Sequence, residues 1–374
     1  MVINDPVFFL SHRKDIATKS LEEGYDVYIA TGPGDAIKEI ESLGLKHHLL
    51  PLNRSGTNPI NEIKSIYSLF KLITKIKPSI CHFVTIKPVI YGGFVTRLSP
   101  VKGVVFAISG LGSSFTGDGF KSSILLSIVK LMYRFALNQQ NSRVIFQNNN
   151  DKSILLDSKV VKEKNSVLIK GSGVELAKYS YTLASENSSI TVVMACRLLK
   201  EKGVFEFIQA AEILKSRNLD INFKLIGEID LGNPKTVTAF EIETWKKDSS
   251  VDIMGFCDDM PTQIKNSDIV VLPSYYGEGL PKVLIEAAAC GRAVITTDHP
   301  GCRDAILPNE TGLLIPIKSP EALADAIYKL YTNPDLRIRM GERGRLLAEQ
   351  EFDVISVVKK HLEIYDELLE SLNV

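Results

Sequence analysis

The chain has 374 residues, enough for two domains of ordinary size, and its 45% hydrophobic and 24% charged residues are typical of a soluble globular protein. It has no run of 18 apolar residues, which excludes a membrane-spanning helix, and its first residues lack the pattern of a signal peptide. The five cysteines have no metal-ligand spacing, so we expect a cytoplasmic protein without a metal or cofactor.

The formal net charge of zero hides an uneven distribution. Residues 1–170 contain 22 Lys and Arg against 13 Asp and Glu, whereas residues 171–374 contain 22 against 31. A basic first half would suit an anionic ligand or an anionic membrane surface. Positive surfaces are also often merely solvated, so the charge alone leaves both interpretations open. We expect no nucleic-acid partner for a chain without net positive charge.

The first half alternates short apolar runs with helical patterns, which predicts a parallel sheet in an α/β domain. Residues 61–77 carry apolar side chains at helical spacing. Residues 119–138 form a strongly apolar helical pattern with Lys121, Lys130 and Arg134. That helix could enter a membrane interface or pack on its own sheet. The expected strands are Met1–Asn4, Asp26–Thr31, His47–Leu52, Ser79–Val84, Gly103–Ser109 and Arg143–Gln147.

Polar residues and glycines follow the ends of several of these strands. Because doubly wound sheets bind ligands at the carboxyl ends of their strands, such residues are candidates for a binding site. For His12 and Arg13, a polar pair in solvent at a helix start is the alternative. The candidates of the first half are His12, Arg13, Lys87, Ser109, Gly110 and Gly112.

A second series of strands and helices follows the polar stretch at residues 185–189. The expected strands are Ile190–Cys196, Phe223–Ile226, Val251–Met254, Asp268–Leu272, Ala293–Thr297 and Leu313–Ile315. The expected helices are Val204–Ser216, Pro281–Cys290, Glu321–Tyr331 and Val354–Leu372. This alternation predicts a second α/β domain.

The stretch from Val271 to Gly291 is the most informative part of the sequence. It passes from a strand through a Gly-rich loop into a helix that we expect to begin at Pro281. The free N–H groups at such a helix start favour an anion such as phosphate. Glu278 lies in the loop, and Glu286 lies inside the helix, where a carboxylate needs donors such as two vicinal hydroxyls. The spacing alone fits equally well a solvent-exposed loop Glu and a helix Glu with a structural partner.

The sequence PSYYGEGLPKVLIEAAACGRAVITTD resembles the Glu-x7-Glu signature of the family 4 retaining glycosyltransferases, which have the GT-B fold. The resemblance implies two Rossmann-like doubly wound α/β domains that face each other across a cleft, with a C-terminal helix crossing back to the first domain. Residues 167–175 resemble the crossover of that family. We therefore expect an acceptor-binding domain at residues 1–170, completed by residues from about 355 to 374. Residues 171–354 would form the donor-binding domain.

The resemblance also implies roles for individual residues. It places Glu278 at the donor sugar, Glu286 at the nucleotide ribose, and Arg197 and Lys202 at the donor diphosphate. Two cations and a helix N-terminus can stabilise the charge that develops on a leaving nucleoside diphosphate. Without the strand before it and the Glu pair elsewhere in the sequence, the segment around the two cations would pass for an ordinary charged loop. Further expected donor contacts are Gly279, Leu280, Lys282, Val283 and Phe256, and the candidates of the first half become acceptor-side residues.

The expected reaction is the retaining transfer of a hexose or N-acetylhexosamine from a nucleoside-diphosphate sugar, in particular a UDP-sugar. The expected acceptor is a saccharide on polyprenyl diphosphate, in polysaccharide, O-antigen or lipopolysaccharide biosynthesis, with the enzyme peripheral at the inner face of the membrane. Many family members have a His where this chain has Ser109, so we assign no catalytic base. The alternatives are another GT-B enzyme, such as a UDP-sugar 2-epimerase, and a non-catalytic subunit that binds nucleotide sugars.

Overall fold

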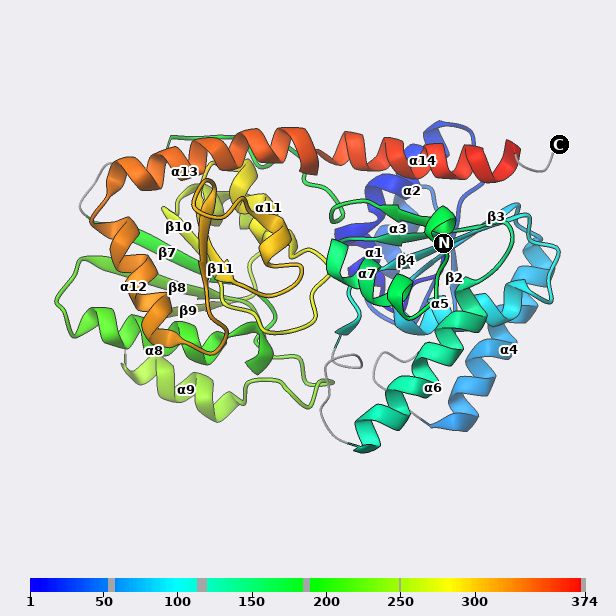
Figure 1. Cartoon of the computed structure of the whole chain (residues 1–374), viewed down its shortest axis with the longest axis horizontal. Helices are drawn as coiled ribbons and strands as arrows, with labels where there is room; N and C mark the ends of the chain where they lie inside the picture. Colours follow the sequence, from blue (N-terminus) through cyan, green and yellow to red (C-terminus); the bar gives the residue numbers. More distant parts are fainter. Residues whose placement is uncertain (53–57, 113–119, 184–188, 249, 371–374) are drawn as a thin grey trace. The chain divides into compact units, whose positions relative to one another are not determined.

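The computed structural model describes residues 1–52, 58–112, 120–183, 189–248 and 250–370 (Figure 1). The side chains of 120–125 and 248 are not described. Residues 119, 185–188, 371 and 372 of the expected elements lie outside the described residues. The chain divides into two compact units: unit 1 comprises Met1–Ser172 and Val354–Val374, and unit 2 comprises Gly173–Asp353. The last helix therefore belongs to unit 1, as the resemblance to GT-B proteins predicted.

Unit 1 contains parallel strands in two groups, which the first residues of the chain join. Val2 forms a parallel bridge to Ala30 on one side and to Phe83 on the other. The backbone N–H of Ile3 also bonds to Ala30 O at 3.0 Å. The segment expected as the strand Met1–Asn4 thus pairs through isolated bridges at Val2 and is too short to count as a strand. The first group is β1 (Tyr28–Thr31) and β2 (Lys46–Leu49), and the second is β3 (Ile80–Val84), β4 (Gly103–Ile108), β5 (Ser142–Phe146) and β6 (Ser166–Leu168).

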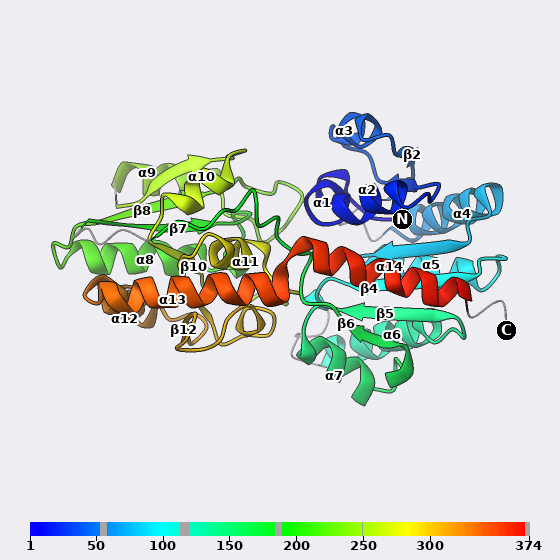
Figure 2. The same ribbon diagram turned by 90° about the horizontal axis from the view of Figure 1, so that it is seen from above.

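Helices cover both faces of these strands (Figures 1 and 2). Successive residues of β4 alternate between the two faces, as a strand requires: Val105 packs in the core beneath α14, and Phe106 packs in the core beneath α5. The helices on the α14 side are α1 (Pro6–His12), α2 (Lys14–Glu22) and α14 (Val354–Glu370). Those on the other side are α4 (Pro59–Ile76), α5 (Ile86–Thr96) and α6 (Phe120–Leu137). The short helices α3 (Ile37–Ser42) and α7 (Asn149–Asp157) pack against β2 and against β5 and β6, respectively.

Unit 2 contains one six-stranded parallel sheet with the order β12-β11-β10-β7-β8-β9. This is the doubly wound order of a Rossmann fold, and it reverses between β7 and β10. The strands are β7 (Ile190–Ala195), β8 (Ile221–Ile226), β9 (Asp252–Gly255), β10 (Ile269–Leu272), β11 (Ala293–Thr297) and β12 (Gly312–Ile315). The predicted α/β architecture with two Rossmann-like units is therefore confirmed.

The helices of unit 2 again form two layers, as Figures 1 and 2 show. One layer contains α8 (Val204–Lys215) and α12 (Pro320–Tyr331), and the other contains α11 (Lys282–Ala289) and α13 (Pro334–Leu347). Two further helices, α9 (Ala239–Asp248) and α10 (Met260–Lys265), pack beside β9 and α11, respectively. The helix predicted to begin at Pro281 begins one residue later, because the ψ of 122° leaves Pro281 extended as the N-cap of α11.

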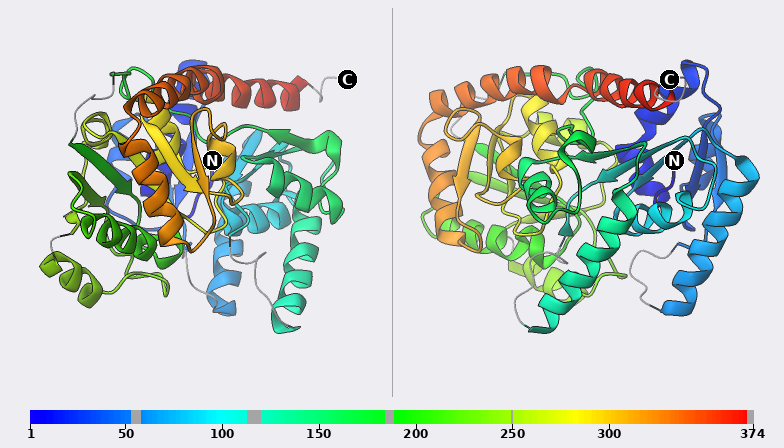
Figure 3. Two further views of the ribbon diagram at one scale, coloured as in Figure 1. Left: turned by 60° about the vertical axis from the view of Figure 1, so that its left-hand side comes forward. Right: turned by 45° about the vertical axis from the view of Figure 1, so that its right-hand side comes forward.

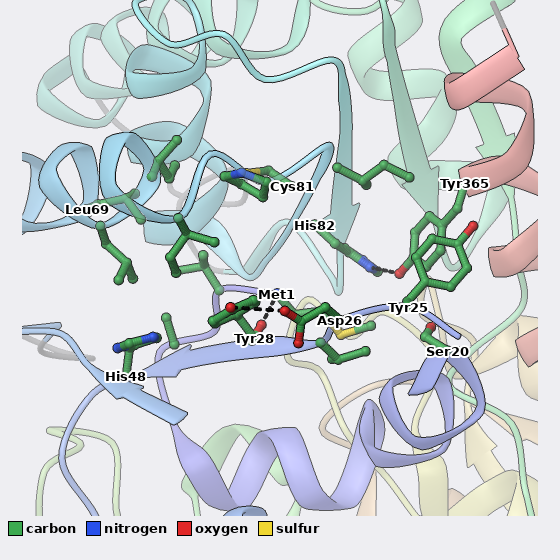
Figure 4. A pocket seen from close by; sticks show the side chains of 18 residues that line it. Met1, Ser20, Tyr25, Asp26, Tyr28, His48, Leu69, Cys81, His82 and Tyr365 are labelled. Carbon is green, nitrogen blue, oxygen red and sulfur yellow. Dashed lines mark hydrogen bonds between the residues drawn. The ribbon is translucent and has the colours of Figure 1, made fainter. Parts of the chain in front are cut away.

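An apolar pocket lies in unit 1 at the amino ends of β1 and β3 (Figure 4). It encloses about 760 Å³ of empty space, including open solvent at its mouth, and its lining includes Leu69 and Ile73 of α4. His82 and Tyr365 line one side of it, and their hydrogen bond is drawn in Figure 4. Ligands of doubly wound sheets bind at the carboxyl ends of the strands. The pocket lies at the opposite ends and is therefore separate from the candidate active site.

Two buried imidazoles connect α14 to the strands of unit 1. His82 Nδ1 lies 2.6 Å from the hydroxyl of Tyr365, and the two histidine rings lie 5.8 Å apart. His361 Nδ1 lies 2.8 Å from Val357 O, and it must carry the proton because a carbonyl oxygen only accepts. Burial, with Arg13 nearby, lowers the pKa of His361 to about 3 and that of His82 well below its usual range. Both imidazoles are therefore neutral at pH 7.

We expect the free energy of unfolding to fall as the pH drops below about 6.5, the usual pKa of histidine. Below that pH the histidines of the unfolded chain become protonated, whereas the buried imidazoles of the folded protein stay neutral until the pH reaches their own lowered pKa. The unfolded state therefore binds more protons, and the stability present above pH 6.5 is lost as the pH falls. Each histidine adds a slope of up to about 1.4 kcal/mol per pH unit. Urea unfolding between pH 7.5 and 5 should show a shallower slope for His361→Leu. His48→Gln, on the partly exposed β2, should change the slope less, and an unchanged slope in His361→Leu would contradict the prediction.

Candidate active site

The donor-side candidates of unit 2 lie where the strand order reverses. Arg197 and Lys202 follow β7, and Glu278 follows β10, which is the neighbour of β7 in the sheet. In doubly wound sheets, ligands bind outside the carboxyl ends of the two strands at such a reversal. The sheet order thus brings together residues that are 76 positions apart in the sequence.

A buried ion pair joins the two segments that follow β7 and β10. Lys202 Nζ binds Glu278 Oε1, and the two side chains are only 13% and 11% exposed. Ser274 Oγ donates a second hydrogen bond to the same carboxylate oxygen at 2.9 Å. Burial works against the ammonium, but the attraction of Glu278 outweighs it, so the pKa of Lys202 is raised. Lys202 is therefore a cation at pH 7, and its bond to Glu278 holds the two side chains together at the carboxyl ends of β7 and β10.

Glu286 lies one helical turn after the start of α11 and is 8% exposed. Burial raises the pKa of its carboxyl group, although Lys282 Nζ lies 3.9 Å away and Tyr179 hydrogen-bonds to it. The structure thus supplies the structural partner that the spacing left open. Among the described residues, no side-chain capping bond is made at the N-cap Pro281 of α11, and a helix start of this kind suits an anion.

The guanidinium of Arg197 has a partner that the sequence did not reveal. Arg197 Nη1 lies 2.7 Å from Asp230 Oδ2, with side chains 40% and 20% exposed. Asp230 lies in the loop after β8, the strand next to β7. Each of the two expected diphosphate-binding cations is therefore already paired with a carboxylate of unit 2.

The other donor-side candidates differ in how exposed they are. Leu280 is 6% exposed and belongs to the core of unit 2, so its side chain is not available to a ligand. Val283 is partly buried and packs against the same core. Gly279 follows Glu278 directly in the same loop. Phe256 follows β9 at the edge of the sheet and is 66% exposed, as a side chain that stacks on a planar ligand would be.

Sequence analysis missed several polar residues near the ion pair. Ser274, Asp230 and His299 each come shortly after a strand, the same signal that selected candidates in the first half. Burial lowers the pKa of His299, and the nearby Glu278 carboxylate opposes that shift. Tyr179 precedes β7 and carries no such signal. Arg303, in the segment after β11, pairs with Asp298.

Among the candidates of unit 1, Lys87 follows β3, and Ser109, Gly110 and Gly112 follow β4, whereas His12 ends α1. Arg13 lies between α1 and α2 and differs from its prediction. It is 2% exposed, and its Nη2 donates to Ser109 Oγ at 3.4 Å. It therefore supports Ser109 from inside and does not line an open surface. Burial lowers the pKa of Arg13 to about 10, so it remains a cation at pH 7. His12 is partly exposed and stacks on Phe8 with 4.2 Å between the rings.

The loop after β4 owes its shape to two glycines and a buried carboxylate. Gly110 and Gly112 have φ values of 108° and 62°, which L side chains rarely adopt. Between them, the N–H of Leu111 donates to Asp151 Oδ2 at 3.2 Å. The candidate Lys87 lies in the first turn of α5. There Lys87 Nζ lies 2.7 Å from Glu62, whose carboxylate also binds the hydroxyl of Tyr91.

The part of the chain that the structure describes contains neither a metal-binding cluster nor a membrane-spanning helix. No group of three or more His, Cys, Asp or Glu residues there could hold a metal ion. No helix there is long and apolar enough to cross a membrane.

Comparison with known families identifies the class of protein. Residues 178–347 match the family model "Glycosyl transferases group 1", and residues 5–148 match "Glycosyl transferase 4-like". A protein of Rickettsia africae described as a glycosyltransferase superposes with a TM-score of 0.78 at 21% identity, covering 98% of this chain and 97% of the other. An Anabaena protein in complex with UDP and glucose gives the same TM-score at 16% identity, covering 98% of each chain. The two Rossmann-like units thus define a GT-B glycosyltransferase.

The particular family follows from the two matched models, which lie in the two units. The chain belongs to the family 4 glycosyltransferases. Among its relatives, the N,N'-diacetylbacillosaminyl-diphospho-undecaprenol alpha-1,3-N-acetylgalactosaminyltransferase of Campylobacter jejuni is 26% identical, covering 95% of this chain and 94% of the relative. The UDP-Gal:alpha-D-GlcNAc-diphosphoundecaprenol alpha-1,3-galactosyltransferase of Escherichia coli is 27% identical, covering 93% and 90%.

Gly301 offers a test of the loop that carries Glu278. Its φ is 80°, and a Cβ there would lie 2.6 Å from the carbonyl oxygens of both Glu278 and Gly279. We expect Gly301→Ala to lower the free energy of unfolding by about 1–3 kcal/mol through this clash, beyond the backbone strain. Gly24→Ala is the matched control, because Gly24 has a φ of 88° and nothing within 4 Å of such a Cβ. Urea unfolding measures the free energy of unfolding of both variants. Equal losses of stability would contradict the prediction, because they would mean that the loop accommodates the added methyl group.

Proposed function

We propose that the protein transfers a sugar, with retention, from a nucleoside-diphosphate sugar to a saccharide on polyprenyl diphosphate. The observation that carries the proposal is the Lys202–Glu278 pair at the strand reversal of unit 2, with Arg197 on the same side of the sheet. A UDP-sugar is the donor we favour, and a hexose or N-acetylhexosamine the transferred unit. The names of the relatives, which specify undecaprenyl-diphosphate saccharides and in one case UDP-Gal, support this choice.

The proposed chemistry requires no catalytic base from the chain. The bond between the anomeric carbon and the diphosphate oxygen breaks, and its electron pair goes to the leaving diphosphate. Arg197, Lys202 and the start of α11 would stabilise the charge that develops there. The acceptor hydroxyl attacks the same face of the sugar, and its proton passes to the leaving phosphate oxygen. Glu278 would stabilise the positive charge that develops on the sugar ring.

The donor would reach Glu286 through its ribose. A buried carboxylate with a raised pKa gains from two hydroxyl donors, because they stabilise its charged form. This contact would be equal in the ground state and the transition state, unlike the contact of Glu278. The two carboxylates should therefore affect different kinetic constants.

We expect Glu278→Gln mainly to lower kcat, because its carboxylate acts as charge develops, and Glu286→Gln mainly to raise KM for the donor. Each lost contact is worth about 1.5–3 kcal/mol, or roughly one to two decades. Steady-state transfer from a panel of UDP-, GDP- and dTDP-sugars measures both constants, with circular dichroism to confirm folding. Near-normal kinetics in both folded variants would mean that the pair is structural. Product formation without any acceptor would favour the epimerase instead.

We also propose a peripheral association of unit 1 with an anionic membrane, where a polyprenyl-linked acceptor would lie. α4 and α6 extend from the same side of unit 1 (Figure 3). Each exposes three large apolar side chains at spacing i, i+3 and i+7: Ile60, Ile63 and Tyr67 on α4, and Ile128, Leu131 and Phe135 on α6. Exposed basic residues accompany them, namely Lys64, Lys71, Lys75 and Arg134.

Both interpretations of the helix predicted at residues 119–138 have support, because it packs on unit 1 through its buried side and is apolar on its exposed side. Tyr133, Ala136 and Leu137 are buried, whereas Leu131 is 68% exposed. An exposed apolar patch with basic neighbours suits the interface of an anionic bilayer.

We expect the protein to sediment with vesicles that contain phosphatidylglycerol and to be released by high salt, because salt screens surface charge. Replacing Ile63 and Leu131 together by Ser should weaken binding at least roughly tenfold, since burying each such side chain contributes about 1.5–3 kcal/mol. Phe240→Ser, at an 82% exposed position of unit 2, is the control and should bind normally. Binding that ignores lipid charge, salt and the double substitution would refute this association.

A further inference from the structure

A second loop of unit 2 holds the segment that carries the two donor-site cations. The loop at residues 228–237 follows β8 and runs along residues 197–200. The N–H of Leu198 donates to Glu228 O at 2.9 Å, and Leu198 O accepts from the N–H of Val237 at 2.8 Å. The N–H of Lys200 donates to Lys235 O at 2.9 Å. The two loops are therefore hydrogen-bonded along their length.

Asp230 is fixed at the turn of this second loop. Its backbone N–H donates to Thr236 Oγ1 at 2.8 Å, and its carbonyl oxygen accepts from the N–H of Asn233 at 2.8 Å. The side chain of Asn233 in turn accepts from the N–H of Lys235 at 2.9 Å. Since these bonds close the loop on itself, the Asp230 carboxylate has little freedom to follow the Arg197 side chain.

The contact between Asp230 and Arg197 occupies one of the N–H donors of the guanidinium. The bond joins Nη1 to Oδ2 at 2.7 Å, and it is the one hydrogen bond of this guanidinium within the described ranges. Arginine has five N–H donors in a planar fork that suits two phosphate oxygens at once. The remaining donors of Arg197, whose side chain is 40% exposed, can thus serve a ligand while Asp230 keeps its own bond.

We propose that Asp230 is a positioning residue that holds the guanidinium of Arg197 ready for the donor diphosphate. The inference rests on the proposed function, since Arg197 must bind the diphosphate for its orientation to matter. A free arginine loses side-chain freedom when it binds, and an arginine that is already held loses less. The nearby negative charge of Asp230 repels the diphosphate at the same time. The carboxylate stands on a closed loop and engages Nη1 of Arg197, and the proposal requires that its orienting effect outweigh this repulsion.

Calorimetric titration of UDP into the full chain tests this assignment. Asp230→Ala should weaken UDP binding about three- to tenfold, the range expected for ordering one long side chain. Asp230→Asn keeps an oxygen acceptor for Arg197 and should remain within about twofold of the unsubstituted protein. Glu310→Ala is the matched control, because it removes an exposed carboxylate that lies 2.6 Å from Arg343 elsewhere in unit 2. It should leave UDP binding unchanged.

A double-substitution cycle separates positioning from general support of the loop. If Asp230 acts through Arg197, Asp230→Ala should change UDP binding little once Arg197→Ala is in place. Equal effects in both backgrounds would overturn the assignment in favour of loop support, and tighter UDP binding in Asp230→Ala and Asp230→Asn would overturn it in favour of repulsion. The proposed donor site would be refuted as well if Arg197→Ala left UDP binding unchanged, or if the unsubstituted protein bound none of UDP, GDP and dTDP. If Arg197→Ala binds UDP more weakly while Asp230→Ala binds it normally, only the role of Asp230 would be refuted.

Discussion

The Lys202–Glu278 ion pair is the interaction on which the donor side of unit 2 depends. Two charges that are each little more than a tenth exposed lose much of their hydration, and mutual attraction often only offsets that loss. Such a pair is weak evidence for stability, because apolar residues of similar size could fill the same space. Its position at the strand reversal gives it another use. It holds a cation and a carboxylate where a ligand of this fold binds.

The backbone segments around this ion pair are closely packed. The φ of Gly203 is 84° at the start of α8, and Gly301 passes directly beneath the carbonyl oxygens of the Glu278 loop. The Asp230 loop then braces the segment from the other side through its bonds to Leu198. Three segments from different parts of unit 2 thus fix the ion pair and its neighbour Arg197. The precision of the site comes from backbone contacts, which tolerate little change in shape.

Sequence patterns predicted the elements well, because strand and helix periodicity is local. They also placed Glu278 in a loop and Glu286 in a helix, as the structure has them, because a long motif fixes both positions. They could not find the bond between Arg197 and Asp230, which exists only because β8 lies beside β7 in the sheet. The burial of Arg13 was equally hidden, since a charged residue between two short helices is usually solvated. Strand order and tertiary burial, not spacing, decide such cases.

The charges of the two units suggest two different ways of attracting anions. On the donor side each cation has a carboxylate beside it: Asp230 with Arg197, Glu278 with Lys202, and Glu286 with Lys282. The formal charges of these six side chains sum to zero, so the diphosphate of the proposed donor would be recognised by directed N–H groups and not by a positive field. The lysines of α4 are exposed to solvent, so their attraction to an anionic surface is a long-range electrostatic interaction that salt screens. Moderate salt should therefore weaken the proposed membrane association well before it weakens nucleotide binding.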